Sequence, residues 1–255
     1  MPIRSFSPGA QVIFFIFIMI FMSLMGDLIF SLALSAVVDY DVLLNINWKD
    51  PRMLISRIFF SQVFYFLLSF LLFLKLSGQR YSDLIHTDRL KWRPILFTLI
   101  ALILLYFSMP ILSWINELIR PILPPGVLAY QAKNEALQEL IVYHNNPVQL
   151  IFSIVVLGLV PAIFEELVFR GFLINKMLAS GISEVGAILM SSTIFAMSHM
   201  QPLNVLVMFA AGCLLAFIYL RFKNIKYNII LHFLFNGVQL FIAYSIANGY
   251  FELGF

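Results

Sequence analysis

Residues 150–174 read LIFSIVVLGLVPAIFEELVFRGFLI, an apolar run that nevertheless holds two adjacent carboxylates and an arginine. A helix of about 20 apolar residues crosses the hydrocarbon core of a bilayer. Ionisable side chains at that depth cost about 2.5–3.5 kcal/mol each on insertion scales, so they need pairing or a chemical purpose. The stretch therefore predicts a membrane helix and marks Glu165, Glu166 and Arg170 as candidate site residues.

The composition of the whole chain predicts the same class of protein. Hydrophobic residues make up 62%, charged residues 11%, and the mean hydropathy is +0.95, whereas soluble domains have about 45–50% and about 25%. The single cysteine, Cys213, excludes a disulfide within the chain. A net charge of +3 gives no reason to expect a nucleic-acid partner. We expect an all-α, polytopic transmembrane helical bundle in contact with lipid.

Apolar runs of spanning length set the expected number of crossings. Because backbone groups in lipid must bond internally, each run should be helical. About seven crossings (six to eight) are expected, at residues 10–38, 54–76, 94–118, 147–169, 183–200, 203–222 and 227–249. Pro110 and Pro161 fall inside two of these runs and predict kinks or breaks. A polar stretch, residues 116–146, predicts a turn at Pro124-Pro125-Gly126 and an amphipathic helix at 133–143.

We expect three parts along the chain: N-terminal transmembrane helices with a polar connecting loop at 1–146, a catalytic helical core at 147–249, and a short tail at 250–255. The apolar run at 10–38 is too long for a cleaved signal peptide, so a retained first helix is favoured. With the N-terminus inside, 11 of the 16 Lys and Arg residues fall in cytoplasmic loops. This bias favours that orientation.

Three polar pairs at helical spacing lie in the last third of the chain. Arg170 follows Glu166 by four residues, which makes these two the natural ion pair and leaves Glu165 as the candidate for chemistry. Phe195 and His199 share a helix face, and so do His232 and Asn236; these two pairs complete the set. Packing alone has no need for two carboxylates and two imidazoles at membrane depth.

Two chemistries are compatible with these side chains. Glu165, His199 and His232 could hold a catalytic Zn²⁺ with an open position. Alternatively, without a metal, the same three side chains position a water directly while His232 and Asn236 stabilise an oxyanion. Both alternatives stay open. Taken singly, each pair also has a structural explanation, as a helix anchor or a packing contact between helices.

The three motifs, EELVFR at 165–170, FAMSH at 195–199 and HFLFN at 232–236, resemble the EExxxR, FxxxH and HxxxN/D motifs of the CPBP family. This family comprises the CAAX proteases, including type II CAAX prenyl endopeptidases, and bacteriocin-processing or Abi-type intramembrane proteases. The resemblance covers about residues 147–249. It implies a membrane hydrolase, described as metalloprotease-like, with Glu165, His199, His232 and Asn236 as catalytic residues. Glu166, Arg170 and Phe195 would support them.

We therefore expect an intramembrane endopeptidase that hydrolyses a peptide bond of a membrane-associated or lipidated substrate, in a bacterial inner (cell) membrane. The HExxH, GxGD and GxSG signatures of other membrane proteases are missing from the sequence. One alternative is a catalytically silent membrane scaffold or immunity protein of the same fold. Another is a proton or ion transporter that uses the same buried groups as a relay.

Overall fold

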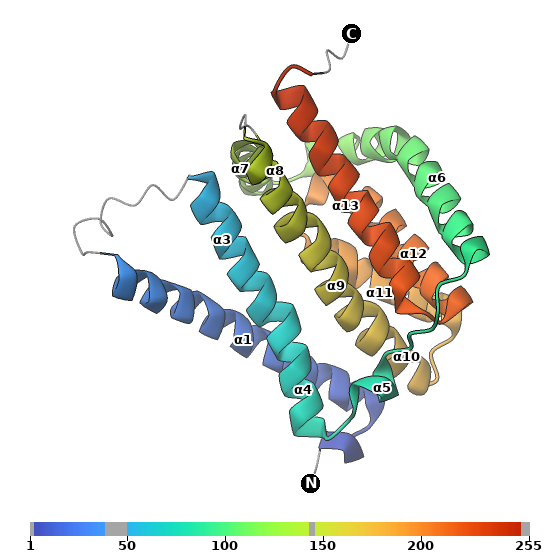
Figure 1. The fold of residues 1–255 in the computed structure, drawn as a ribbon. Helices are drawn as coiled ribbons and strands as arrows, with labels where there is room; N and C mark the ends of the chain where they lie inside the picture. Colours follow the sequence, from blue (N-terminus) through green and yellow to red (C-terminus); the bar gives the residue numbers. More distant parts are fainter. Residues whose placement is uncertain (1–2, 39–49, 143–145, 251–255) are drawn as a thin grey trace. The chain divides into compact units, whose positions relative to one another are not determined.

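The computed structural model describes residues 3–38, 50–142 and 146–250, and these residues form helices joined by short loops, with no strand (Figure 1). The expected all-α polytopic class is confirmed. The elements are η1 Ile3–Ser5, α1 Pro8–Val37, α3 Pro51–Gln62, η2 Val63–Leu68, α4 Ser69–Ser77, α5 Tyr81–Leu84, α6 Trp92–Glu117, η3 Arg120–Ile122, α7 Pro125–Val142, α8 Pro147–Ser153, η4 Ile154–Leu159, α9 Val160–Glu166, η5 Leu167–Ile174, α10 Asn175–Ala179, α11 Glu184–Ser198, η6 Pro202–Asn204, α12 Val205–Phe222 and α13 Ile225–Ala247.

Six helical stretches within the described residues are long and apolar enough to span a bilayer: Pro8–Val37, Pro51–Ser77, Trp92–Ile122, Pro147–Ala179, Pro202–Phe222 and Ile225–Ala247. The seventh expected crossing, 183–200, corresponds to α11, an apolar helix of only 15 residues. At 1.5 Å per residue, α11 is shorter than the roughly 30 Å hydrocarbon core of a typical bilayer. The protein is thus an integral, multi-pass membrane protein.

Several helices begin with a proline preceded by a polar capping residue. Ser7, Asp50 and Asn146 each accept a hydrogen bond from a backbone N–H in the first turn of α1, α3 and α8. Proline fits this position because its missing N–H would have no partner inside the helix. One prediction is wrong for the same reason. Pro125 and Gly126 do not form a turn but begin α7, so this helix starts eight residues before the predicted residue 133.

The interior prolines do not end their helices. α6 continues through Pro110 and curves along its length (Figure 1). The helix containing Pro161 departs from α geometry in two π-helical segments, η4 just before the proline and η5 just after Glu166. Wider π turns accommodate backbone groups that an α-helix would leave unbonded, and they are frequent at functional sites. The predicted irregularity is therefore present as wide turns, without a break.

The chain divides into two compact units. The first comprises residues 1–80, 137–165 and 236–255, and its buried residues Ile55, Ile141 and Val156 pack together. Asp27 on α1 forms an ion pair with Arg57 there, at 3.7 Å. The second unit comprises residues 81–136 and 166–235.

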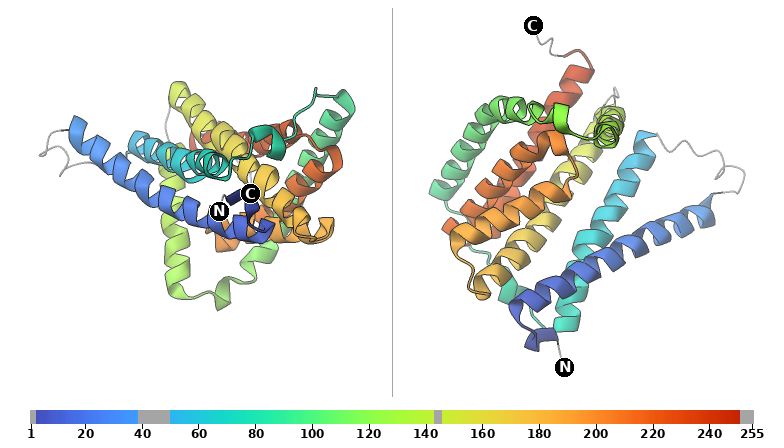
Figure 2. Two further views of the ribbon diagram at one scale, coloured as in Figure 1. Left: turned by 90° about the horizontal axis from the view of Figure 1, so that it is seen from below. Right: turned by 180° about the vertical axis from the view of Figure 1, so that it is seen from behind.

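The core of the second unit lies among α6, α12 and the first part of α13, with Leu105, Leu215 and Leu231 among its buried residues. α11 lies alongside α12, as both figures show (Figures 1 and 2). Near the C-terminal end of α6, the side chain of Asn116 accepts a hydrogen bond from the backbone N–H of Leu206. These contacts fix the elements that carry most of the candidate site.

Candidate active site

The predicted ion pair between Glu166 and Arg170 is present and buried. Arg170 Nη1 donates to Glu166 Oε1 at 2.9 Å, and the two side chains are 1% and 0% exposed. Arg170 Nη2 also donates to the carbonyl of Gly212 on α12, at 3.1 Å. The guanidinium thus connects its own helix to α12. A buried charge pair of this kind is stable only when further hydrogen bonds satisfy its remaining atoms.

Gly212 allows this contact because it lets α11 and α12 approach closely. A Cβ at this position would lie 3.1 Å from Ser192 Cα and 3.3 Å from a ring carbon of Phe195. Small residues at membrane helix contacts permit such close approach of backbones.

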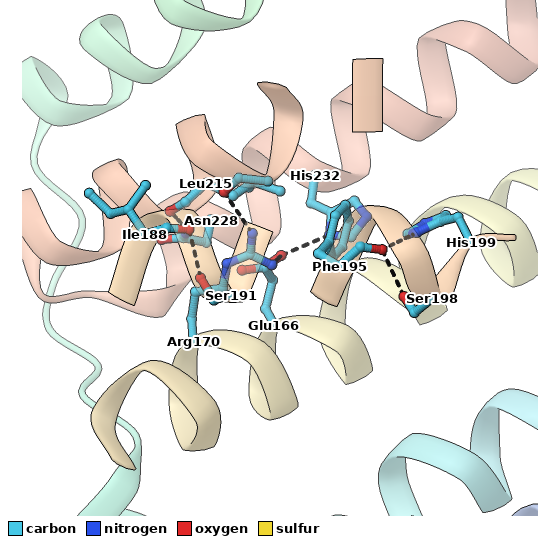
Figure 3. Close-up of polar contacts among 11 residues, drawn as sticks. Glu166, Arg170, Ile188, Ser191, Phe195, Ser198, His199, Leu215, Asn228 and His232 are labelled. Atoms are coloured by element: carbon cyan, nitrogen blue, oxygen red, sulfur yellow. Dashed lines mark hydrogen bonds and ion pairs between the residues drawn. The ribbon is translucent and has the colours of Figure 1, made fainter. Parts of the chain in front are cut away.

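His232 provides a contact that the sequence motifs did not predict. Its Nδ1 lies 2.9 Å from the same Glu166 Oε1 that accepts from Arg170 (Figure 3). Because a carboxylate only accepts, Nδ1 must carry the hydrogen. The carboxylate therefore fixes the orientation of the imidazole and leaves Nε2 as its working atom. The other oxygen, Glu166 Oε2, is buried without a hydrogen-bond partner among the described residues.

His199 is held in a comparable way. It caps the C-terminal end of α11, and its Nδ1 lies 2.7 Å from the backbone carbonyl of Phe195, one turn earlier. Since a carbonyl also only accepts, Nδ1 carries the hydrogen and Nε2 presents a lone pair. The two histidines thus both have their Nδ1 occupied.

Phe195 lies in contact with both imidazoles. The centroid of its ring is 4.6 Å from that of His199 and 5.8 Å from that of His232. The guanidinium of Arg170 lies over the same ring, 5.1 Å from its centroid. Figure 3 shows these side chains pointing toward one another from three helices. Phe195 therefore packs against the two histidines and the arginine, and its supporting role stays a prediction.

Asn228 belongs to the same cluster and was missed from the sequence. It precedes His232 by one turn of α13, is fully buried, and donates from Nδ2 to the carbonyl of Leu215. Its Oδ1 has no partner in the described part of the chain. The available signal was the spacing of Asn228, His232 and Asn236, which recurs every four residues and places all three on one helix face.

Glu165 and Asn236 lie in the first unit, each adjacent to the boundary. Glu165 is the penultimate residue of α9, next to Glu166, and Asn236 follows His232 by one turn of α13. Their predicted convergence with His199 and His232 stays a prediction.

The zinc alternative needs at least three protein ligands. Within residues 3–38, 50–142 and 146–250, no group of three or more His, Cys, Asp or Glu side chains has a geometry that could hold a metal ion. Catalytic zinc sites use three such ligands. The predicted set of Glu165, His199 and His232 includes residues of both units, so the zinc alternative stays a prediction.

The fold and the site together define the class of protein. It is a multi-pass membrane protein in which a buried carboxylate, a guanidinium and an imidazole are joined across the helices. Residues 147–238 match the model of the family described as "Type II CAAX prenyl endopeptidase Rce1-like". This segment is therefore similar to that family, and the resemblance expected from the motifs is confirmed. The family is one of proteases. Comparison with curated proteins and with solved structures gave no match.

Proposed function

We propose that this protein is an intramembrane endopeptidase that hydrolyses a peptide bond of a membrane-associated or lipidated substrate, with residues 147–249 as its catalytic core and 1–146 as accessory helices. The observation that supports it best is the double engagement of Glu166 by Arg170 and His232. A carboxylate committed to two cationic or donor groups is a poor base. Of the two adjacent glutamates, Glu165 is therefore the one assigned to the chemistry.

In this mechanism Glu165 takes a proton from a water, whose oxygen attacks the scissile carbonyl carbon. His199 Nε2 accepts a hydrogen bond from the same water and orients it, because its Nδ1 is occupied by the Phe195 carbonyl. The tetrahedral intermediate then breaks its C–N bond, and the proton passes from Glu165 to the leaving amine. The products are a carboxylate and an amine.

His232 and Asn236 are assigned to the oxyanion of that intermediate. His232 can donate from Nε2 only as an imidazolium, because Nδ1 already donates to Glu166. The Glu166 carboxylate compensates the charge on this ring, and Arg170 adds a further positive charge nearby. A net positive cluster is suited to a developing negative charge.

The experiment uses purified protein in liposomes with two fluorescent peptides, one prenylated with a CAAX end and one carrying an unmodified membrane anchor. Products are identified by mass spectrometry. We expect Glu165→Gln to lower the cleavage rate by about 10²- to 10⁴-fold, the usual contribution of a general base. Glu139→Gln, an exposed glutamate on α7, is the matched control. A Glu165→Gln protein as active as the control would refute the proposal.

A silent scaffold is the second candidate, favoured by the fact that the Glu166 network joins the helices regardless of catalysis. In that case no variant of Glu165 changes the cellular phenotype, and the parent protein cleaves neither peptide.

We place the protein in a bacterial inner membrane, because the loops between its spans are short.

A further inference from the structure

A cavity of about 490 Å³ lies at one end of the second unit, and its lining does not include Glu166, Arg170 or His232. Its wall comes from the loop before α6 and from the turn between α12 and α13. Six of its lining residues are charged or polar: Asp88, Arg89, Lys91, Arg221, Asn224 and Tyr227.

Buried hydrogen bonds hold the wall of this cavity in place. Asn224 and Tyr227 are 2% and 3% exposed. Asn224 Nδ2 donates to the carbonyl of Asp88 at 3.2 Å, and the backbone N–H of Lys91 donates to the Tyr227 hydroxyl at 2.8 Å. The backbone N–H of Ile225 donates to the carbonyl of His86 at 3.2 Å. The loop is thus fastened to the start of α13.

The cavity carries a positive charge. Arg89, Lys91 and Arg221 line it against one carboxylate, that of Asp88. These three cations are exposed, and none forms an ion pair with the described residues. α6 and α13 both begin at the cavity, so their positive N-terminal ends add to the field. The arrangement attracts an anion.

The cavity also lies where candidate membrane spans end. α6 starts at Trp92, α12 ends at Phe222 and α13 starts at Ile225, and all three belong to spanning helices. Trp92 is 68% exposed, as expected of the tryptophans that gather at the level of the lipid headgroups. In the predicted orientation, which counts residues 183–200 as a crossing, the basic residues of these loops place this end on the cytoplasmic side.

We propose that this cavity binds the phosphate of an anionic phospholipid headgroup, a function separate from peptide hydrolysis. Basic pockets between transmembrane helices on the cytoplasmic side suit such headgroups. The phosphate contacts Arg89, Lys91 and Arg221, and the acyl chains extend along the surface of the spanning helices. The position at the ends of three spans favours a lipid over a soluble phosphate.

The test measures binding to the purified full-length protein in a neutral detergent by thermophoresis. The ligands are short-chain phosphatidylglycerol, short-chain phosphatidylcholine and inorganic phosphate. The variant Arg89→Gln/Lys91→Gln/Arg221→Gln removes the charges and keeps the backbone N–H of Lys91. At about fivefold per charge, we expect phosphatidylglycerol affinity to fall on the order of 100-fold. Arg221→Gln alone should lower it about fivefold.

The matched control is Arg4→Gln/Lys75→Gln/Lys133→Gln, which removes three exposed cations elsewhere. The control should bind as the parent does, and thermal unfolding confirms that each variant is folded. Equal affinity of the parent and both Arg221 variants would overturn the proposal, and so would an equal loss in the control. Inorganic phosphate binding as tightly as phosphatidylglycerol, or phosphatidylcholine doing so, would overturn the lipid assignment.

Discussion

Replacing Arg170 with alanine tests the network on which the site is built. The change deletes the hydrogen bond to Glu166 Oε1 at 2.9 Å and the one to the Gly212 carbonyl at 3.1 Å. It also removes the cation from above the rings of Phe169 and Phe195. Among the described residues, Glu166 then keeps its contact with His232 and stays fully buried.

Breaking a buried ion pair by removing one partner costs about 3–5 kcal/mol, because the remaining charge is uncompensated. For a domain of 150–250 residues, each kcal/mol changes Tm by about 2–4 °C. We therefore expect Arg170→Ala to lower the Tm of the purified protein by roughly 6–20 °C. Arg170→Lys keeps the charge but loses the second donor, so its Tm should fall between those of the parent and the alanine variant.

The assay is thermal unfolding in detergent, followed by intrinsic tryptophan fluorescence. Arg120→Ala is the matched control, because Arg120 pairs with Glu117 at similar helical spacing but on the surface, with the two side chains about half exposed. Surface pairs contribute little, so the control should unfold close to the parent. If Arg170→Ala changed Tm no more than Arg120→Ala, the buried pair would not be a stabilising element.

The remaining predictions concern single side chains around the network. Asn236→Ala should lower the cleavage rate on the order of 10²- to 10³-fold at unchanged Tm, as expected of an oxyanion donor; a loss of stability alone would make it structural. Gly212→Ala should destabilise by about 1–3 kcal/mol in denaturant unfolding, because its Cβ meets Ser192 and Phe195. Asn228→Ala should cost about 1 kcal/mol in the same assay by removing the hydrogen bond to the Leu215 carbonyl.

The spans could be predicted from the sequence because bilayer thickness sets a minimum run of apolar residues. The Glu166 to Arg170 pair could be predicted as well, since residues four apart share a helix face whatever the rest of the fold does. The end of α11 could not be predicted as well. The expected span 183–200 includes His199 and Met200, which lie in the turn after the helix.

The contact between His232 and Glu166 could not be predicted, because it joins residues 66 positions apart and depends on how two helices pack. Gly212 gave no signal either, since a glycine in an apolar run has many explanations. Asn228 differs from these two: its four-residue spacing from His232 was present in the sequence. The spacing of residues along one helix can be predicted from the sequence. Contacts between residues on different helices depend on how the helices pack, so they cannot.

The two adjacent glutamates provide the most direct test of the proposed mechanism. Cleavage of the membrane-anchored peptides and Tm are measured together for Glu165→Gln and Glu166→Gln. We expect Glu165→Gln to lower the cleavage rate by about 10²- to 10⁴-fold at unchanged Tm, and Glu166→Gln to lower Tm because Arg170 and His232 lose their shared anion. The opposite result, in which Glu165→Gln still cleaves and Glu166→Gln is folded as stably as the parent but inactive, would contradict the assignment.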